Sequence, residues 1–324
     1  MALLNGLAVY LFIILEYSYS IWNICQLPDR LLFAIPKKGR LHEHCISLLK
    51  GADINFHRHN RLDIALVKNL PIALIFLPAA DIAKFVGEGN VDLGITGQDM
   101  VEECEVANKI DEIMELDFGH CRLQVQVPIK SGIDKVEELV GKKIVTSFDI
   151  LASKYFSKLD EKHLTDEEKA EGKKTKIEYV SGSVEAACAL GLADGIVDLV
   201  ETGETMKVAG LHAISTVLET QAILIRNKNP SDPHLVTKIT SRLKGVIAAK
   251  QYVLLNYNIL RENVREATKI TPGRQAPTIS PLDDGNWVEV QSMVLKKEVA
   301  EIMDKLEEIG ARDIILFKID NCRV

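Results

Sequence analysis

Ile196–Thr205 reads IVDLVETGET, which is typical of an apolar strand, a turn and the start of a helix. Gly203 lets the backbone approach a ligand without a Cβ clash, and amides at the helix start, together with two threonine hydroxyls, can hold a phosphate. Asp198 and Glu201 upstream suit ribose hydroxyls or Mg²⁺, which prefers oxygen ligands. An ordinary strand–helix turn with a threonine N-cap explains the same pattern, so the neighbouring segments decide between the two interpretations.

Before this segment, strand and helix patterns alternate from Leu31 onward, which predicts an α/β fold. Such strands are covered on both faces, and ligand loops lie at their carboxyl ends. A first group comprises the expected strands Leu31–Pro36, Leu62–Val67, Ile72–Leu77 and Val91–Thr96, with a helix at Ala80–Gly87.

A second α/β group is expected to begin near Arg122–Val127, and the strand at Thr216–Ile225 is expected to return to the first. Within it, the charged insert Asp160–Lys176 is most simply a solvated surface loop. We expect two lobes joined by two crossings, which places a cleft between them. Lobe I would contain residues 28–122 and 211–229, and lobe II residues 123–210, in a bilobal, periplasmic-binding-protein-like core.

After Asn229-Pro230 the expected order of elements is a long helix followed by β-α-β-β-α-β. That order is the order of a ferredoxin-like α+β domain, here spanning residues 230–324. By analogy of fold alone, small open sheets of this kind pair with copies of themselves and hold small effectors.

Composition excludes several classes of protein. The 324 residues carry a net charge of −7, which argues against a nucleic-acid partner. Six scattered cysteines without a CxxC pair predict neither a zinc site nor a disulfide scaffold, and fit a reducing, cytoplasmic setting. The pairs His42/His44 and His57/His59 favour exposed histidines over metal ligands.

Residues 1–27 differ from the rest of the chain. The segment is largely apolar but contains Glu16, and no basic residue precedes Arg30. It fits neither a signal peptide nor an uninterrupted membrane span, so a membrane association is not expected, although an anchor stays open. We interpret it as a leader outside the native fold, such as translated upstream or intronic sequence.

Two further loops fall at the expected ligand end of the sheets. Gly182-Ser183 ends a strand and Glu185 opens the next helix, where it is either a ligand in the cleft or an acid that complements the helix dipole. Lys37 and Arg40 follow the first strand in a cationic turn suited to polyphosphate. Asp92 precedes a glycine-containing strand end that we interpret as a packing feature.

Several motifs in fixed order resemble one family. The chain is similar to the ATP phosphoribosyltransferases of histidine biosynthesis, in their long, fungal-type form with a regulatory domain. The resemblance covers nearly the whole chain after the leader and rests on AIPKKGRL (Ala34–Leu41), VDLGITG (Val91–Gly97), SGSVEAA (Ser181–Ala187), the Asp198–Thr205 loop, and PTISPL followed by WVEV (Pro277–Val290).

The resemblance implies that N1 of ATP attacks phosphoribosyl pyrophosphate, with Mg²⁺, and that pyrophosphate leaves as phosphoribosyl-ATP forms. An oxocarbenium-like displacement needs positioning and charge stabilisation more than proton transfer, which suits the lack of a histidine-based triad. At matching positions, Glu201, Thr202, Gly203, Glu204 and Thr205 would hold the 5′-phosphate and Asp198 the ribose. Lys37 and Arg40 would face the pyrophosphate or ATP, Glu185 would lie in the cleft, and Gly182, Ser183 and Arg61 are further expected contacts.

The same resemblance implies feedback inhibition by L-histidine in a hexamer built from dimers. Thr278, in GRQAPTIS (Gly273–Ser280), is the first expected effector contact, followed by Arg274, Asn258 and Asp313. Turn and strand-end chemistry explains these four residues equally well. Two other functions stay open: a two-lobed binding protein without catalysis, and a histidine-sensing subunit with an inactive catalytic half.

Overall fold

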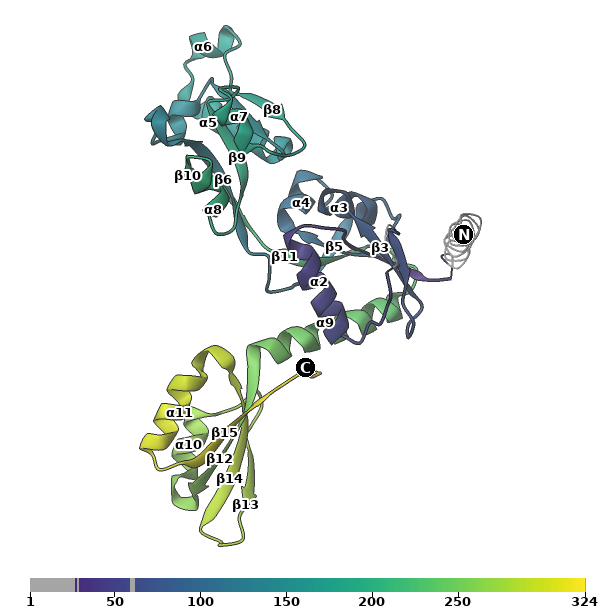
Figure 1. Cartoon of the computed structure of the whole chain (residues 1–324), viewed down its shortest axis with the longest axis vertical. Coiled ribbons are helices and arrows are strands. Elements are labelled where there is room, and N and C mark those ends of the chain that lie inside the picture. Colours follow the sequence, from purple (N-terminus) through teal and green to yellow (C-terminus); the bar gives the residue numbers. More distant parts are fainter. Residues whose placement is uncertain (1–26, 28, 59–61, 324) are drawn as a thin grey trace, which may run out of the picture. The chain divides into compact units, whose positions relative to one another are not determined.

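The computed structural model describes residues 27, 29–58 and 62–323 (Figure 1). All of the expected leader except Leu27, as well as Arg61 and His59, lie outside these residues. The chain forms two compact units. The first contains the described residues up to Cys45 and Phe56–Pro233, and the second contains Ile46–Asn55 and the chain from His234 onward.

One sheet of the first unit has the order β2-β3-β1-β4-β11-β5. Its three central strands β3, β1 and β4 are parallel. They carry apolar residues on both faces, as is typical of parallel strands that are buried on both sides. The elements of this lobe are β1 (Leu31–Pro36), α2 (Arg40–Gly51), β2 (Ile64–Leu66), β3 (Ile72–Leu77), α3 (Ala79–Gly87), β4 (Leu93–Gly97), α4 (Gln98–Glu103), β5 (Ile110–Glu115) and β11 (Ala222–Asn227).

Two features of the VDLGITG segment are structural. A Cβ at Gly94 would lie 2.6 Å from the Cγ2 atom of Ile82, so only glycine lets α3 pack this closely on β4. The carboxylate of Asp92 accepts the backbone amides of Leu32 at 2.8 Å and Ser231 at 2.6 Å. These contacts support the interpretation of the segment as a packing feature.

The second sheet of this unit has the order β10-β6-β9-β7-β8, in which β7, β8 and β9 are parallel. Helix α5 packs on it through Leu151, Ala152 and Phe156. The elements of this lobe are β6 (Cys121–Pro128), β7 (Lys143–Thr146), α5 (Asp149–His163), α6 (Asp166–Ala170), β8 (Lys176–Tyr179), α7 (Glu185–Ala189), β9 (Gly195–Val200), α8 (Glu204–Val208) and β10 (Leu211–Thr220).

The structure differs from two expectations for this lobe. The expected single strand Thr216–Ile225 is two strands, and β10 pairs with β6, so the chain returns to the first sheet at Gln221 rather than before Leu211. The insert Asp160–Lys176 is not only a loop, since α5 runs into it and α6 follows. Thr165 and Glu168 form a reciprocal capping box at the start of α6. The sequence pattern of such a box predicts a helix start, which the charged composition of the insert alone does not indicate.

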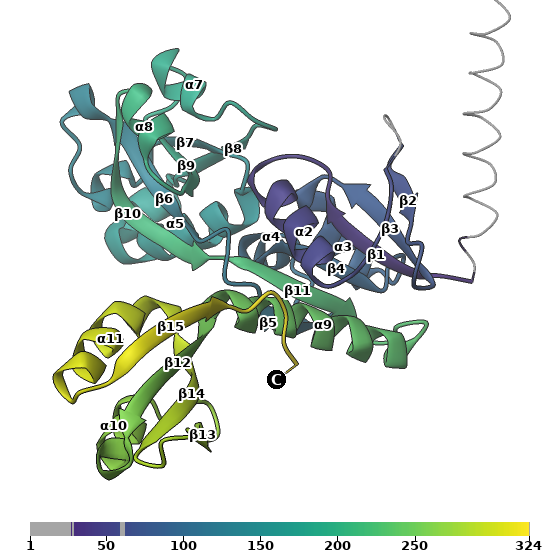
Figure 2. The same ribbon diagram turned by 60° about the horizontal axis from the view of Figure 1, so that its bottom comes forward.

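The second unit contains a four-stranded antiparallel sheet of order β13-β14-β12-β15. Alternate residues of β12 and β14 are buried, and α10 and α11 cover one face (Figure 2). The expected β-α-β-β-α-β order is confirmed. The elements are α9 (Pro233–Gln251), β12 (Tyr252–Leu260), α10 (Val264–Ile270), β13 (Thr278–Pro281), β14 (Trp287–Leu295), α11 (Val299–Glu308) and β15 (Arg312–Lys318).

Within the described part of the chain, no helix is both long enough and apolar enough to cross a membrane. The first histidine pair has local partners: Nδ1 of His42 lies 2.6 Å from the carbonyl oxygen of Pro36, and the ring of His44 stacks on Phe118 at 5.1 Å between centroids.

Candidate active site

A cavity of about 310 Å³ lies at the carboxyl end of β9. Arg40, the first residue of α2, contributes to its wall from the first sheet, and Gln126, Glu185 and Asp198 contribute from the second. The structure therefore brings most of the predicted phosphate-site residues into one cavity: Arg40, Glu185, Asp198, Glu201, Thr202, Gly203, Glu204 and Thr205.

Gly203 forms the turn between β9 and α8 in the left-handed conformation, with φ of +80°. A Cβ there would meet its nearest neighbour, Cε of Met206, at an ordinary 3.6 Å. The backbone angle therefore favours glycine more than any protein contact does. The Thr202 hydroxyl accepts the amide of Glu204 at 3.4 Å, which orders the turn at the start of α8.

Asp198 is the acidic centre of the cavity. Burial raises the pKa of its carboxyl, the nearby charge of Glu185 raises it further, and the Leu199 amide and Arg40 act in the opposite direction. The Leu199 amide donates to the carboxylate at 2.8 Å, and Nε2 of Gln126 donates to the Asp198 carbonyl at 3.4 Å. A half-buried carboxylate without its own cation is suited to donors or positive charge brought by a ligand.

Arg40 stands over a buried polar pair. Asp99 is 3% exposed and accepts a hydrogen bond from the Thr220 hydroxyl at 2.7 Å. Burial raises the pKa of Asp99, while Thr220 and the charge of Arg40 lower it. Burial raises the pKa of the Cys121 thiol, and the nearby Arg40 side chain lowers it. The charge of Arg40 therefore acts on both Asp99 and Cys121.

Sequence reasoning did not find Asp99, Cys121 or Gln126. A usable signal existed for Asp99, because Gly97 ends β4 two residues before it. A Cβ at Gly97 would lie 2.0 Å from the Asp99 carboxylate, so the glycine makes room for this buried acid. Gln126 carries no local signal, since only its pairing beside β9 brings it to the cavity.

Some predicted residues do not line the cavity. Lys37 instead forms an ion pair with Asp63, with Nζ 2.8 Å from the carboxylate. Gly182 and Ser183 lie in the loop before α7 but outside the cavity lining, and Ser183 has a φ of +50°. Arg61 is outside the described residues. Roles for these four residues stay predictions.

The expected effector residues are spread over the sheet of the second unit. The Asn258 side chain donates to the Asp313 carboxylate at 3.0 Å, so these two lie together. The Arg274 guanidinium lies 5.7 Å from the ring centroid of Tyr252, at the other end of β12. Thr278 begins β13, opposite Gln291.

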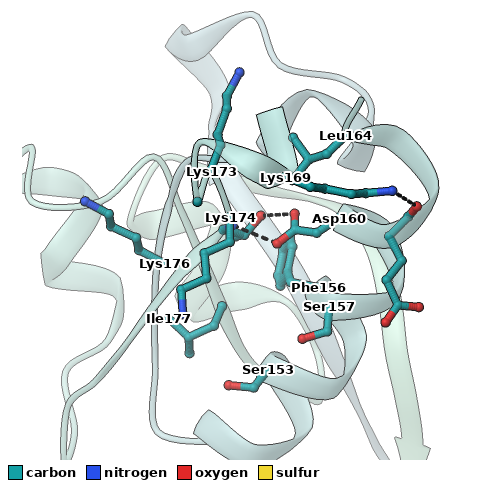
Figure 3. Close-up of a pocket in the computed structure, with 13 residues that line it drawn as sticks. Ser153, Phe156, Ser157, Asp160, Leu164, Lys169, Lys173, Lys174, Lys176 and Ile177 are labelled. Carbon is teal, nitrogen blue, oxygen red and sulfur yellow. Dashed lines mark hydrogen bonds between the residues drawn. The ribbon is translucent and has the colours of Figure 1, made fainter. Parts of the chain in front are cut away.

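A larger cavity, of about 680 Å³, lies elsewhere in the same lobe, between α5, α6 and the start of β8 (Figure 3). Sequence analysis did not predict it. Lysines and serines contribute much of its wall, and none of its lining residues belongs to the cavity that contains Gly203.

Two family models match the chain. The ATP phosphoribosyltransferase model matches residues 78–245, and the HisG C-terminal domain model matches residues 249–321. The boundary between the matches falls near the end of α9, where the four-stranded sheet begins.

Curated relatives extend the match to nearly the whole chain. It is 58% identical to the ATP phosphoribosyltransferase of Yarrowia lipolytica and 56% identical to that of Saccharomyces cerevisiae, each time over 92% of this chain and 98% of the relative. Among solved structures, the ATP phosphoribosyl transferase (HisG:HisZ) complex from Thermotoga maritima matches with a TM-score of 0.55 and 26% identity, over 68% of this chain and 98% of that chain. The chain therefore belongs to the ATP phosphoribosyltransferase family, the glycosyltransferases that catalyse the first step of histidine biosynthesis.

Proposed function

We propose that the cavity around Gly203 is where this enzyme transfers the phosphoribosyl group of phosphoribosyl pyrophosphate to N1 of ATP. The observation that carries the proposal is the meeting, in one cavity, of a left-handed glycine turn, four carboxylates and an arginine. The backbone amides from Gly203 to Thr205 and the threonine hydroxyls would bind the 5′-phosphate. A phosphate at this position gains from the amides that the first turn of α8 leaves unpaired.

Asp198 and Glu185 would hold the ribose. Their carboxylates accept hydrogen bonds from ribose hydroxyls, and those bonds become stronger as positive charge develops on the ring in the transition state. In the free enzyme, burial raises the pKa of Asp198 most, and repulsion from the charge of Glu185 raises it further. Positive charge developing at the anomeric carbon relieves that repulsion, which stabilises the transition state more than the ground state.

Arg40 would stabilise the departing pyrophosphate. Arg40 lines the cavity, and a positive charge placed there stabilises the negative charge that develops on the leaving group. Lys37, which now pairs with Asp63 at an exposed site, would exchange that weak ion pair for substrate phosphates. Gly182, Ser183 and Arg61 would complete the substrate contacts.

Mg²⁺ fits this cavity as a partner of the substrate. Within the described residues, no group of three or more His, Cys, Asp and Glu side chains forms a metal site. Mg²⁺ commonly binds through one or two carboxylates and substrate phosphates, and Asp198 and Glu185 would be its carboxylates among the four that line the cavity. The ion supplies charge neutralisation of the leaving pyrophosphate.

We also propose that L-histidine binds the second unit and inhibits the enzyme, with Thr278, Arg274 and the Asn258–Asp313 pair as its contacts. The left-handed backbone of Asp313, with φ of +51°, and its bond to Asn258 are features that a polar ligand site would explain.

A homo-oligomer, from dimer to hexamer, is supported by edge strand β15, which leaves Ile315, Leu316 and Phe317 38–51% exposed. We also propose that the regulatory domain begins at residue 230. The proposed location of the enzyme is the cytoplasm.

One assay tests the reaction. The purified full-length protein is mixed with ATP, phosphoribosyl pyrophosphate and Mg²⁺, and formation of phosphoribosyl-ATP is followed by its absorbance. Product is expected only when all three components are present, and added histidine is expected to suppress it. Binding of phosphoribosyl pyrophosphate without product would contradict a catalytic role and favour a two-lobed binding protein. Turnover that histidine does not change would contradict the regulatory assignment alone.

A further inference from the structure

The 680 Å³ cavity lies away from the catalytic cavity on the same sheet. Strands β7, β8 and β9 are parallel, and the catalytic cavity follows the carboxyl end of β9. The larger cavity is lined instead by residues at the amino end of β8 and by the second half of α5. A ligand there would occupy the opposite end of the sheet from the substrates.

Hydrogen bonds fix the wall of this cavity. The carboxylate of Asp160 accepts the amide of Thr175 at 2.8 Å and its hydroxyl at 2.6 Å, and Thr175 is 7% exposed. Nζ of Lys169 donates to the carbonyl oxygen of Glu161 at 2.9 Å. These bonds tie α6 and the segment before β8 to α5, so the cavity has a defined wall (Figure 3).

The wall is positively charged. Four lysines and two acids line the cavity, and both charges of Asp160 and Lys169 are already engaged in the bonds that form the wall. Lys173 is paired with Glu168 outside the lining. Within the described residues, Lys174 and Lys176 form no ion pair, so the charges of both cavity-lining lysines are available to an anion.

Hydroxyl groups face the same space. Ser153 and Ser157 lie one turn apart on α5. Figure 3 shows their hydroxyls on the same side of the helix as the Lys174 side chain. Lys176 also lines the cavity, and Figure 3 shows its ammonium group directed outward, away from the two serines. Ammonium groups and hydroxyls around one opening match the oxygen atoms of a phosphate, while a buried floor formed by Phe156 and Leu164 limits how deeply water surrounds it.

We propose that this cavity is a second anion site, which binds a small phosphate-bearing compound between Lys174, Lys176 and the two serines. The assignment is independent of the reaction at Gly203. Helix α5 carries both serines and also contacts α4 of the other lobe through its first turn. A ligand in this site would therefore contact a helix that is hydrogen-bonded to the other lobe.

Calorimetry of the full-length protein with inorganic tripolyphosphate, at about 0.15 M salt to screen weak surface contacts, tests the proposal. Two sites are expected, one in each cavity. Lys174→Gln/Lys176→Gln should weaken one of them by about tenfold or more and keep turnover of ATP and phosphoribosyl pyrophosphate. Gly203→Val should remove the other site and leave this one.

The matched control is Lys158→Gln/Lys162→Gln, which removes the same charge from α5 outside the cavity. Equal weakening in both double variants would show a general field effect and overturn the site, as would unchanged binding in Lys174→Gln/Lys176→Gln. A second measurement uses the wild-type protein: tripolyphosphate should protect Lys174 and Lys176 from an amine-reactive reagent, read by mass spectrometry, and should leave Lys158 reactive. Absence of that protection would also overturn the proposal.

Discussion

The carboxylate of Glu103 accepts the backbone amide of Ile150 at 2.9 Å, and this bond joins the two lobes of the first unit. The second carboxylate oxygen accepts the amide of Leu151, also at 2.9 Å. Residue Phe148, the N-cap of α5, supplies no side-chain bond of its own. A helix of one lobe is thus capped by an acid of the other, and the ion pair of Glu105 with Lys154 at 2.7 Å lies beside it.

Glu103→Ala is expected to destabilise the first unit by about 1–2 kcal/mol, the usual effect of removing a helix cap. Burial raises the pKa of Glu103, and its hydrogen bonds from the amides of Leu151 and Ile150 lower it. The measurement is the shift of the urea unfolding midpoint. Glu102→Ala, at the exposed neighbouring position, is the control, and equal shifts in the two variants would refute the capping role.

Gly203→Val is expected to raise the KM for phosphoribosyl pyrophosphate at least ~10-fold, because a left-handed β-branched residue costs about 1–3 kcal/mol and alters the turn that holds the phosphate. Gly210→Val is the control. Gly210 has a φ of +70° and open space around its Cβ position, so it tests backbone strain in the same lobe without touching the cavity. The measurement is the steady-state KM for phosphoribosyl pyrophosphate in both variants. An unchanged KM in Gly203→Val would show that this turn does not bind the substrate.

Arg40→Ala is expected to lower kcat/KM by about 10²–10³, the usual loss when a charge-stabilising donor is removed from an active site. Lys38→Ala, two residues earlier and exposed, should retain wild-type kinetics. Initial rates of pyrophosphate release over a range of substrate concentrations give kcat/KM for both variants. Wild-type turnover in Arg40→Ala would show that the guanidinium does not act on the leaving group.

Asp198→Asn should separate activity from stability. The folded pKa of Asp198 is raised, so its stabilising contribution is complete below the ordinary carboxyl pKa of 3.8 and is lost as pH rises through the folded pKa. Above that range the wild-type protein carries a buried charge that asparagine lacks. The variant should therefore have the higher Tm at neutral pH, with the gap closing on acidification, and should lose most of its turnover. A lower Tm at pH 7 would contradict the assignment of burial as the dominant effect.

Thr278→Ala is expected to raise the histidine concentration for half inhibition by about 3–10-fold, the effect of one lost hydrogen bond, while uninhibited turnover stays near wild type. Thr268→Ala, at a half-buried threonine on α10 of the same unit, is the control. Inhibition curves at fixed substrate give the answer. If Thr278→Ala is inhibited like the wild type, histidine does not contact this side chain.

Local sequence determined much of this protein. Alternating apolar runs predict the strands, the β-α-β-β-α-β order predicts the C-terminal domain, and Gly203 followed by a helix start predicts the turn between β9 and α8. These features depend on residues close together in the chain, where backbone preference and periodicity act directly. The family resemblance, which also depends on short local motifs, is confirmed.

Tertiary structure decided what long-range pairing brings together. Gln126 reaches the cavity only because β6 pairs with β9, and β10 belongs to lobe II because it pairs with β6, although its sequence reads as a strand of either lobe. Asp99 lies 121 residues from Thr220, yet the two form the buried pair beneath Arg40. Burial and pairing are properties of the packed chain, so the environment that raises the pKa of Asp198 in the IVDLVETGET segment came from the fold rather than from its neighbours in sequence.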